Sequence, residues 1–227
     1  MKCPRLALGL SLALCLGIWT GVRADTPAAR YHWENDAVEG GMRVFTSEVK
    51  DHGYDAVKVV STLPLAVQPL LDALQNFSDY PRWYHNAAAV SELSRPSTPP
   101  EVHVLPDGKL QPVRNNGAWL LLFVQHTPPL SDRWAVLRCA MLPGPQGSVR
   151  FEFQSQPTRP ELAPKGAERM QLRGFWQLTP LDRARTTVAF VLDVDPNTSA
   201  PAFLVDPIVR ETAVKTLRGL QRVATHR

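Results

Sequence analysis

Cysteine is scarce in this chain of 227 residues, which has three. Two of them, Cys3 and Cys15, lie in the first fifteen residues, and only Cys139 lies further along. If the N-terminal segment is removed, an intrachain disulfide is impossible. The fold must then depend on a hydrophobic core, which a chain of about 200 residues is long enough to build.

The sequence also lacks an apolar run long enough to span a membrane, and its longest uncharged apolar stretch lies at the N-terminus. The chain begins with basic Lys2 and Arg5, continues without charge from Leu6 to Trp19, and reaches small residues around Ala24. This order is typical of a secretory signal peptide, and the apolar run is short of the roughly 20 residues that span a bilayer. We predict cleavage after Ala24 and a periplasmic or secreted protein; a retained N-terminal anchor is the alternative.

Concentrated charge is also missing. Removal of residues 1–24 takes away three basic residues and leaves 22 basic against 21 acidic ones. Binding of nucleic acid needs a concentrated basic face, and no basic run is present. We therefore expect no nucleic-acid partner.

The common sequence motifs of catalytic sites are missing. The chain has no Gly-x-Ser-x-Gly, Walker, His-Glu-x-x-His or Cys-x-x-Cys sequence, and its histidines lack metal-ligand spacing, so we predict no metal and no cofactor. His126, Ser131 and Asp132 are the residue types of a hydrolase triad, but triads are defined by geometry, and a proline-rich turn should not align them. Cys139 lies in an apolar segment and is expected to be inert.

Strand patterns dominate what is present. Alternation predicts strands at 43–50, 55–62, 88–95, 101–106, 117–126, 133–142, 148–155, 168–178 and 185–194. A helical stripe predicts a helix over 65–77 that ends at Asp79–Pro81, and a second helix that begins with Asp206 as N-cap and Pro207 as first residue. Its predicted buried stripe is Val209, Ala213, Thr216, Leu217, Leu220 and Ala224.

These elements predict an α+β fold in one domain. The proline-rich segments 96–100 and 157–160 are interpreted as loops inside that domain, because neither half has a sufficient set of elements. Residues 25–32 are expected to be a lead-in, and residues 33–227 the domain. Asn197-Thr198-Ser199 is a formal glycosylation sequence that we interpret first as a turn.

Several segments resemble bacterial START-like (SRPBCC) domains. In chain order these segments are residues 33–34, 41–46, 79–84, 128–138, 174–180, 193–196 and 201–205, the last of them just before the C-terminal helix. Together they span about residues 33–222, and their order and spacing carry the resemblance. It implies a helix-grip fold, in which a curved antiparallel sheet wraps a long C-terminal helix around an internal apolar cavity. Trp134 departs from the pattern, because bacterial members often have an acidic residue there.

The resemblance also implies a polar anchor. Arg138 matches an arginine that points into the cavity of START relatives, and its acidic partner on the preceding strand is replaced here by Gln125 or His126. A buried arginine needs such a partner or a ligand. The alternative is that Arg138 faces solvent. Arg133 is expected to tie the preceding loop to backbone carbonyls.

Aromatic residues supply the expected apolar wall. Trp119 and Phe123 share one strand face by the period of two, Phe190 lies on another strand, and Trp176 lies between them in sequence. Phe203 precedes the last helix and is a candidate for an entry gate. For each of these residues plain core packing is the alternative, since aromatic side chains dominate cores and apolar pockets alike.

The sequence therefore predicts non-catalytic binding, and possible transfer, of a lipid or another apolar small molecule by a monomer with transient membrane contact. Two alternatives stay open. One is a cyclase- or hydrolase-type enzyme that uses the same cavity, which a residue with a strongly shifted pKa in the pocket would favour. The other is a protein-interaction module of the cell envelope, which a filled core and an exposed apolar patch would favour.

Overall fold

Antiparallel strands are the dominant elements of the described part of the chain, as the strand patterns of the sequence predict. The computed structural model describes residues 30–98, 100–111, 117–157 and 159–226, and residues 31–227 form one compact unit. The predicted signal peptide, residues 1–24, and most of the predicted lead-in, residues 25–32, lie outside the described residues. Their cleavage and export remain predictions.

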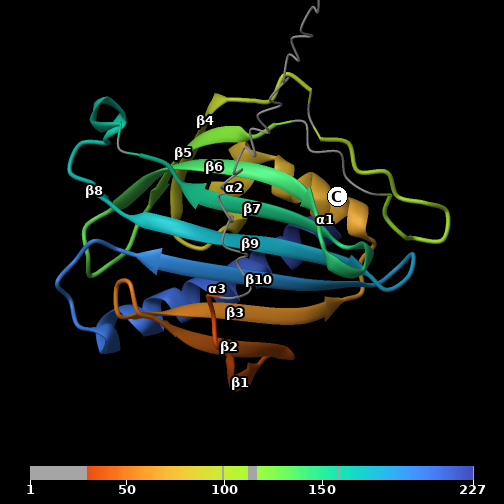
Figure 1. Cartoon of the computed structure of the whole chain (residues 1–227), viewed down its shortest axis with the longest axis horizontal. Coiled ribbons are helices and arrows are strands. Elements are labelled where there is room, and N and C mark those ends of the chain that lie inside the picture. Colours follow the sequence, from red (N-terminus) through yellow and green to blue (C-terminus); the bar gives the residue numbers. More distant parts are fainter. Residues whose placement is uncertain (1–29, 99, 112–116, 158, 227) are drawn as a thin grey trace, which may run out of the picture. The chain divides into compact units, whose positions relative to one another are not determined.

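One curved sheet is built from all the strands of the described part of the chain, in the order β1-β2-β3-β10-β9-β7-β6-β5-β4, with the short β8 parallel to β6 (Figure 1). The strands are β1 (Glu34–Glu39), β2 (Met42–Val49), β3 (Tyr54–Leu63), β4 (Ala87–Ser94), β5 (Trp119–Gln125), β6 (Arg133–Pro143), β7 (Val149–Ser155), β8 (Glu168–Arg169), β9 (Gln171–Pro180) and β10 (Thr186–Asp195). All neighbours along this path pair in antiparallel fashion.

Two strand predictions need correction. The segment 101–106 is not a strand, and only an isolated bridge joins Val104 to Leu110, because flanking prolines remove ladder donors. The edge strand β1 was missed. Its sequence, Glu-Asn-Asp-Ala-Val-Glu, is half charged and mostly exposed, which suits an edge that must not recruit other chains but gives no apolar alternation.

The helices lie on one side of the sheet, which we call the inner face; the opposite side is the outer face (Figure 1). They are α1 (Val67–Gln75), the 3-10 turn η2 (Phe77–Asp79), α2 (Tyr80–Trp83) and α3 (Ala202–Thr225), and two further 3-10 turns, η3 (Pro145–Gly147) and η4 (Pro160–Leu162), lie in loops. The predicted first helix does not end the helical segment at Asp79, since η2 and α2 continue it to Trp83. Proline at the second position of α2 needs no N–H there.

The long helix α3 starts earlier than predicted. It begins at Ala202 after Pro201, with Pro207 inside it, so Asp206 is not the N-cap. Oδ1 of Asp206 instead accepts a hydrogen bond from the backbone N–H of Asp55, 3.0 Å away. Pro207 is tolerated because the carbonyl it leaves without a donor, that of residue 203, lies at the start of the helix, where water can replace it.

The core lies between the inner face of the sheet and the helices. All six residues of the predicted α3 stripe are buried there: Val209, Ala213, Thr216, Leu217, Leu220 and Ala224. They pack mainly on β3, α1 and β10. No helix among the described residues is both long and apolar enough to cross a bilayer.

Candidate functional site

A small apolar chamber lies under the first half of α3. Its volume is about 30 Å³, and we call it the mouth chamber. The loop after β5, the start of β6, the end of β10 and α3 bound it. It is lined by Gln125, Thr127, Leu130, Arg133, Met170, Leu192, Val194, Pro196, Val205, Ile208, Val209 and Thr212.

A second chamber lies deeper between the sheet and α2. This deep chamber has a volume of about 20 Å³ and an almost wholly apolar, aromatic-rich wall. It is lined by Tyr80, Tyr84, Val90, Leu121, Phe123, Leu137, Cys139, Phe151, Phe153, Leu172 and Trp176.

Strand β5 connects the two chambers. Its inward side chains alternate, and Leu121 and Phe123 line the deep chamber while Gln125 lines the mouth chamber. Successive inward residues of a strand are about 7 Å apart. The two chambers therefore follow one another along the inner face of β5.

Four buried polar side chains line the mouth chamber: Thr127, whose hydroxyl donates to the Ser131 carbonyl at 2.8 Å, and Gln125, Arg133 and Thr212. Gln125 is 6% exposed, Arg133 2% and Thr212 3%. Gln125 and Arg133 are direct partners across the β5–β6 ladder, so their Cβ atoms lie about 5 Å apart. The polar groups are therefore concentrated on one wall and on the facing helix.

The hydrogen bonds of Gln125, Arg133 and Thr212 are incomplete. Arg133 donates through Nε to the carbonyl of Pro196 at 2.9 Å and through Nη1 to the carbonyl and hydroxyl of Ser131 at 2.9 and 2.6 Å. Nη1 also lies 3.1 Å from a carboxylate oxygen of Glu168. Nη2 makes no hydrogen bond with a described residue, and neither does the Gln125 amide or the Thr212 hydroxyl, but all of these atoms stay within reach of water. Arg133 thus ties the loop as predicted and also lines the chamber.

The titratable groups of the deep chamber stay protonated at neutral pH. Burial raises the pKa of the Tyr80 and Tyr84 hydroxyls, with smaller contributions to Tyr80 from Cys139 and Tyr84. Burial also raises the pKa of the Cys139 thiol. Tyr80 donates to the carbonyl of Leu74 at 2.8 Å. A protonated, buried thiol is a poor nucleophile, in agreement with the prediction for Cys139.

The predicted aromatic residues divide into lining and packing roles. Phe123 and Trp176 line the deep chamber. Phe190 stacks on Trp176 with ring centroids 3.9 Å apart, and Trp119 meets Phe77 edge-on at 5.6 Å. Both Phe190 and Trp119 face inward, but they support the wall and do not line either chamber.

Arg138 is not the polar anchor predicted from the resemblance. The inward residues of β6 are Arg133, Ala135, Leu137 and Cys139, so Arg138 points to the outer face, where it is exposed. Apolar Trp134 and Val136 on the outer face hide the alternation, since the run from 134 to 137 is buried on both sides. The inward arginine of this strand is Arg133, and Gln125 lies opposite it.

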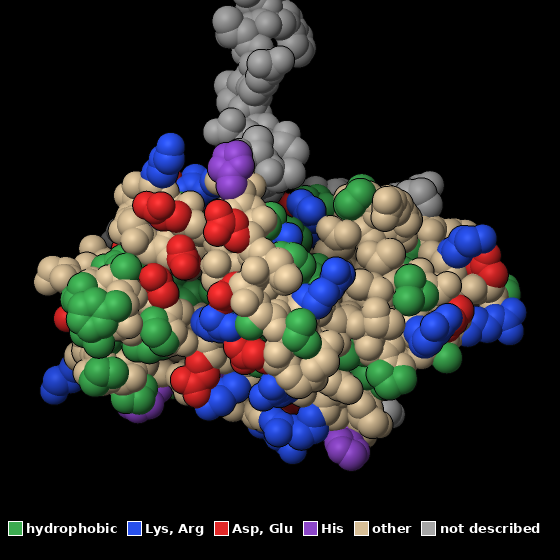
Figure 2. Space-filling model, turned by 90° about the horizontal axis from the view of Figure 1, so that it is seen from below, with side chains coloured by type: hydrophobic (Ala, Val, Ile, Leu, Met, Phe, Trp, Pro, Cys, Tyr) green, Lys and Arg blue, Asp and Glu red, His purple; other side chains and the backbone are tan. Residues whose placement is uncertain are grey.

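Phe203 does not line the chamber either. It is 73% exposed and Leu204 51% exposed, whereas the next residue, Val205, is buried and lines the mouth chamber. Hydrophobic side chains gather at the left end of Figure 2, the end at which Figure 1 places the start of α3. These two residues form an exposed apolar rim beside the mouth chamber.

The three triad-type residues do not form a triad. Nδ1 of His126 lies 2.6 Å from Oδ1 of Asp132, but the Ser131 hydroxyl accepts from Arg133 and the histidine and aspartate are both exposed. The expectation that this turn would not align them agrees with the geometry. Among the described residues no group of three or more His, Cys, Asp or Glu side chains is placed to hold a metal ion.

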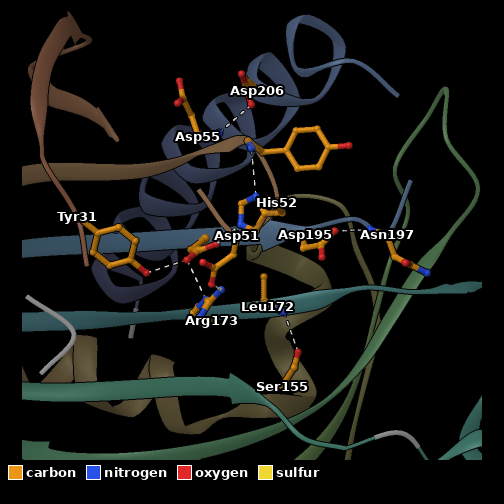
Figure 3. A network of polar contacts seen from close by, with 12 residues as sticks. Tyr31, Asp51, His52, Asp55, Ser155, Leu172, Arg173, Asp195, Asn197 and Asp206 are labelled. Atoms are coloured by element: carbon orange, nitrogen blue, oxygen red, sulfur yellow. Dashed lines mark hydrogen bonds and ion pairs between the residues drawn. The ribbon is translucent and has the colours of Figure 1, made fainter. Parts of the chain in front are cut away.

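A buried polar network on the outer face was missed from the sequence. Tyr31, His52 and Arg173 converge on the carboxylate of Asp193, with distances of 2.9 Å each (Figure 3). Nδ1 of His52 accepts from the backbone N–H of Tyr54 at 3.1 Å, so Nε2 carries the proton donated to Asp193. Both ring nitrogens are engaged in contacts inside the protein, and the network is a structural clip.

A larger hollow of about 420 Å³ lies beside the second half of α3. We call it the basic groove; it is lined by Pro81, Arg82, Trp83, Tyr84, His85, Asn86, Lys215, Arg218, Gly219 and Arg222. Arg82 and Lys215 pair with Asp79 and Glu211. At Gly219 the helix touches the α2 segment so closely that an added Cβ would lie 1.9 Å from the Trp83 carbonyl oxygen.

The sheet that wraps a long C-terminal helix around interior chambers defines a helix-grip protein of the START type, and the predicted fold is confirmed. The family model described as polyketide cyclase/dehydrase and lipid transport matches residues 63–221, so the chain belongs to that family. The chain is also 24% identical over 197 residues to an uncharacterised protein of Pseudomonas aeruginosa, across 86% of this chain and 88% of that protein.

Solved structures with the same fold include lipid transfer proteins and an aromatase/cyclase. A STAR-related lipid transfer protein of Xanthomonas axonopodis is similar with a TM-score of 0.67 and 20% identity, over 85% of this chain and 98% of that chain. The human StAR-related lipid transfer protein 5 is similar with a TM-score of 0.68 and 13% identity, over 90% and 89%. A Streptomyces aromatase/cyclase reaches a TM-score of 0.50 at 12% identity, over 76% and 94%.

Proposed function

We propose that this protein binds a lipid or a similar apolar molecule between its sheet and α3 and does not transform it. The observation that carries the proposal is the pair of adjoining apolar chambers in the interior of a chain from the polyketide cyclase/dehydrase and lipid transport family. Burial of apolar surface supplies about 25 cal/mol per Å² to such binding. The similar lipid transfer proteins support this function, and the cyclase relative supports the enzymatic alternative less well.

Catalysis finds little support in the site. The titratable groups that line the deep chamber are two tyrosines and a cysteine whose pKa is raised by burial, so each is protonated at neutral pH. General acid–base catalysis works best with a group whose pKa lies near the working pH. The only charged residue that lines the mouth chamber, Arg133, is a permanent cation.

The chambers must widen to hold a ligand. Each has room for little more than a water molecule or two, whereas pockets for drug-sized ligands have volumes of about 300 to 1,000 Å³. The small volumes and the exposed rim of Phe203 and Leu204 favour a second candidate, an interaction module of the cell envelope. Under the first proposal the same rim contacts a membrane while the ligand enters beside Val205.

We further propose that the protein is exported to the periplasm or secreted after cleavage at Ala24. An N-terminal sequence of the protein purified from a Gram-negative host would test cleavage. A chain that begins at Asp25 is the expected result, and a chain that retains residues 1–24 would contradict it.

Native mass spectrometry of the purified protein, followed by extraction and lipid analysis, tests the binding proposal. The expected result is one apolar molecule per chain, released on denaturation. Arg138→Ala serves as a control variant, because its side chain lies on the outer face and its loss should leave the bound molecule in place. A protein that stays empty after incubation with a membrane extract would contradict lipid binding and favour the interaction module.

A further inference from the structure

The mouth chamber contains more hydrogen-bonding capacity than the protein uses. The Gln125 amide, the Thr212 hydroxyl and Nη2 of Arg133 belong to buried residues of a mostly apolar wall, and no hydrogen bond joins them to a described residue. None of these atoms is fully closed off, so each is satisfied by water or by the polar end of a ligand that replaces the water. Three such groups in one chamber indicate a polar end of a ligand.

The charge of the wall selects the sign of that end. Arg133 is the one charged residue among the residues that line the chamber, and no acidic side chain lines it. Glu168 approaches Nη1 of Arg133 from β8, and its side chain is 57% exposed. The guanidinium is thus partly neutralised from the solvent side, which favours a monoanion over a dianion at the free Nη2.

The donors match a carboxylate. Nη2 of Arg133, the NH₂ of Gln125 and the hydroxyl of Thr212 can all donate, and an ionised carboxylate has two acceptor oxygens with about four lone-pair sites. Gln125 and Arg133 face each other across the β5–β6 ladder, while Thr212 reaches in from α3. A carboxylate between strand and helix can therefore receive donors from both sides.

The deep chamber gives the direction of the rest of the ligand. It begins at Phe123, the inward residue of β5 next to Gln125, and its wall is apolar and aromatic-rich. Because both chambers are small, a single hydrocarbon chain displaces fewer side chains than two chains would. A molecule with one anionic end and one apolar chain fits this order of polar and apolar walls.

We propose that the mouth chamber binds the carboxylate of a long-chain carboxylic acid, whose hydrocarbon chain enters the deep chamber. Gln125, Arg133 and Thr212 bind the carboxylate, and Phe123 and Trp176 contact the chain. This inference rests on the proposed binding function and specifies its ligand class.

Displacement of the neutral fluorescent probe N-phenylnaphthylamine from delipidated protein tests the proposal. Palmitate, its methyl ester and the corresponding fatty alcohol have the same chain and differ at the polar end. Because charge-assisted hydrogen bonds are about twice as strong as neutral ones, palmitate should bind about tenfold more tightly than the methyl ester.

Two substitutions remove single donors with little change in shape. Gln125→Met and Thr212→Val should each weaken palmitate about fivefold and methyl palmitate about twofold, because the ester carbonyl accepts only a neutral hydrogen bond; the unequal loss separates an anchor from a general packing role. Arg133 is left intact, because it also holds the Ser131 loop and Pro196. Gln154→Met, on the exposed outer side of β7, is the matched control and should change neither affinity.

The outcomes distinguish this inference from the function on which it rests. Equal affinity for palmitate and its methyl ester, or an equal loss of both in the variants, would overturn the carboxylate anchor and leave apolar binding standing. If the probe and all three ligands fail to bind a protein with a normal unfolding transition, the proposed function itself is wrong.

Discussion

The two halves of α3 border two very different spaces. Its first half covers the mouth chamber, a space of about 30 Å³ walled by buried side chains. Its second half borders the basic groove, about 420 Å³ in volume and open to side chains such as Arg218 and Arg222, which are exposed. The larger space is lined mostly by polar side chains that are exposed or half-buried, and the smaller one mostly by buried apolar side chains.

The difference shows that volume alone does not locate a binding site. Exposed arginines near the end of a helix have an ordinary structural role, because cations there interact favourably with the helix dipole. An unpaired amide and hydroxyl in an apolar wall have no such role. We therefore assign ligand binding to the first half of α3 and helix attachment to the second half, and four predictions test this division.

The largest effect is expected at the attachment end. Gly219→Val places side-chain atoms where the Trp83 carbonyl lies 1.9 Å from an added Cβ. Such overpacking should lower the free energy of unfolding by about 3 kcal/mol or more, measured by urea denaturation. Arg222→Ala, one turn further along the exposed side of the helix, should change it by less than about 0.5 kcal/mol. Equal effects of the two would show that the contact at Gly219 is not tight.

The next effect is expected in the mouth chamber. Leu192 is buried and lines it, so Leu192→Ala should cost about 2 to 3 kcal/mol through lost packing and a larger cavity. An apolar ligand that fills the space should restore part of the loss, because binding to the native state stabilises it. Thermal unfolding with and without ligand measures this, with exposed Leu181→Ala as control. The ligand also stabilises the parent and Gly219→Val, so a gain in Leu192→Ala no larger than the gain in those two proteins would break the comparison.

A smaller, pH-dependent effect is expected at His85 in the basic groove. Burial lowers the pKa of His85, Lys215 lowers it further, and Glu211 partly opposes them. The folded state thus prefers the neutral ring, so stability is complete above the unfolded pKa of about 6.5 and falls as pH drops below it, until the folded pKa is passed. Urea denaturation between pH 7.5 and pH 5, as rough limits, should show a flatter profile for His85→Gln. His103→Gln, in an exposed loop, should follow the parent protein.

The smallest effect is expected from the groove arginines. The double variant Arg218→Gln/Arg222→Gln should change the free energy of unfolding by less than about 1 kcal/mol, since the side chains are exposed and only their interaction with the helix end is lost. Its affinity for the apolar probe should equal that of the parent protein. A clear loss of probe or palmitate affinity would move part of the binding site to the second half of α3.

Much of the fold follows from local pattern. Alternation in strands such as β2 and β7, strand-length apolar runs in β5 and β10, and the stripe of α3 predict the elements. The start of α3 does not follow, since Asp206 and Pro207 imitate a helix start while Asp206 actually accepts from Asp55 across the structure. A tertiary contact of that kind leaves no local signal.

The candidate site was predicted only in part. Phe123, Gln125 and Trp176 line the chambers, but the resemblance selected Arg138 where the structure places Arg133 inward. Which arginine points inward depends on which alternate residues of β6 face the helices. The sequence does not show this for a strand whose residues are apolar and buried on both faces. Thr212 was missed because a polar residue on the buried side of a helix is visible only once the facing wall is known.

The contact between Gly219 and the Trp83 carbonyl also bears on how relatives of this protein diverge. A helix pinned at one point cannot slide along its axis to enlarge the space beneath it. Homologues that keep this glycine must therefore fit ligands of different length by exchanging side chains on the sheet. Their ligand preferences should then be legible from the volumes of a few inward residues on β5, β9 and β10, while the helix position stays constant.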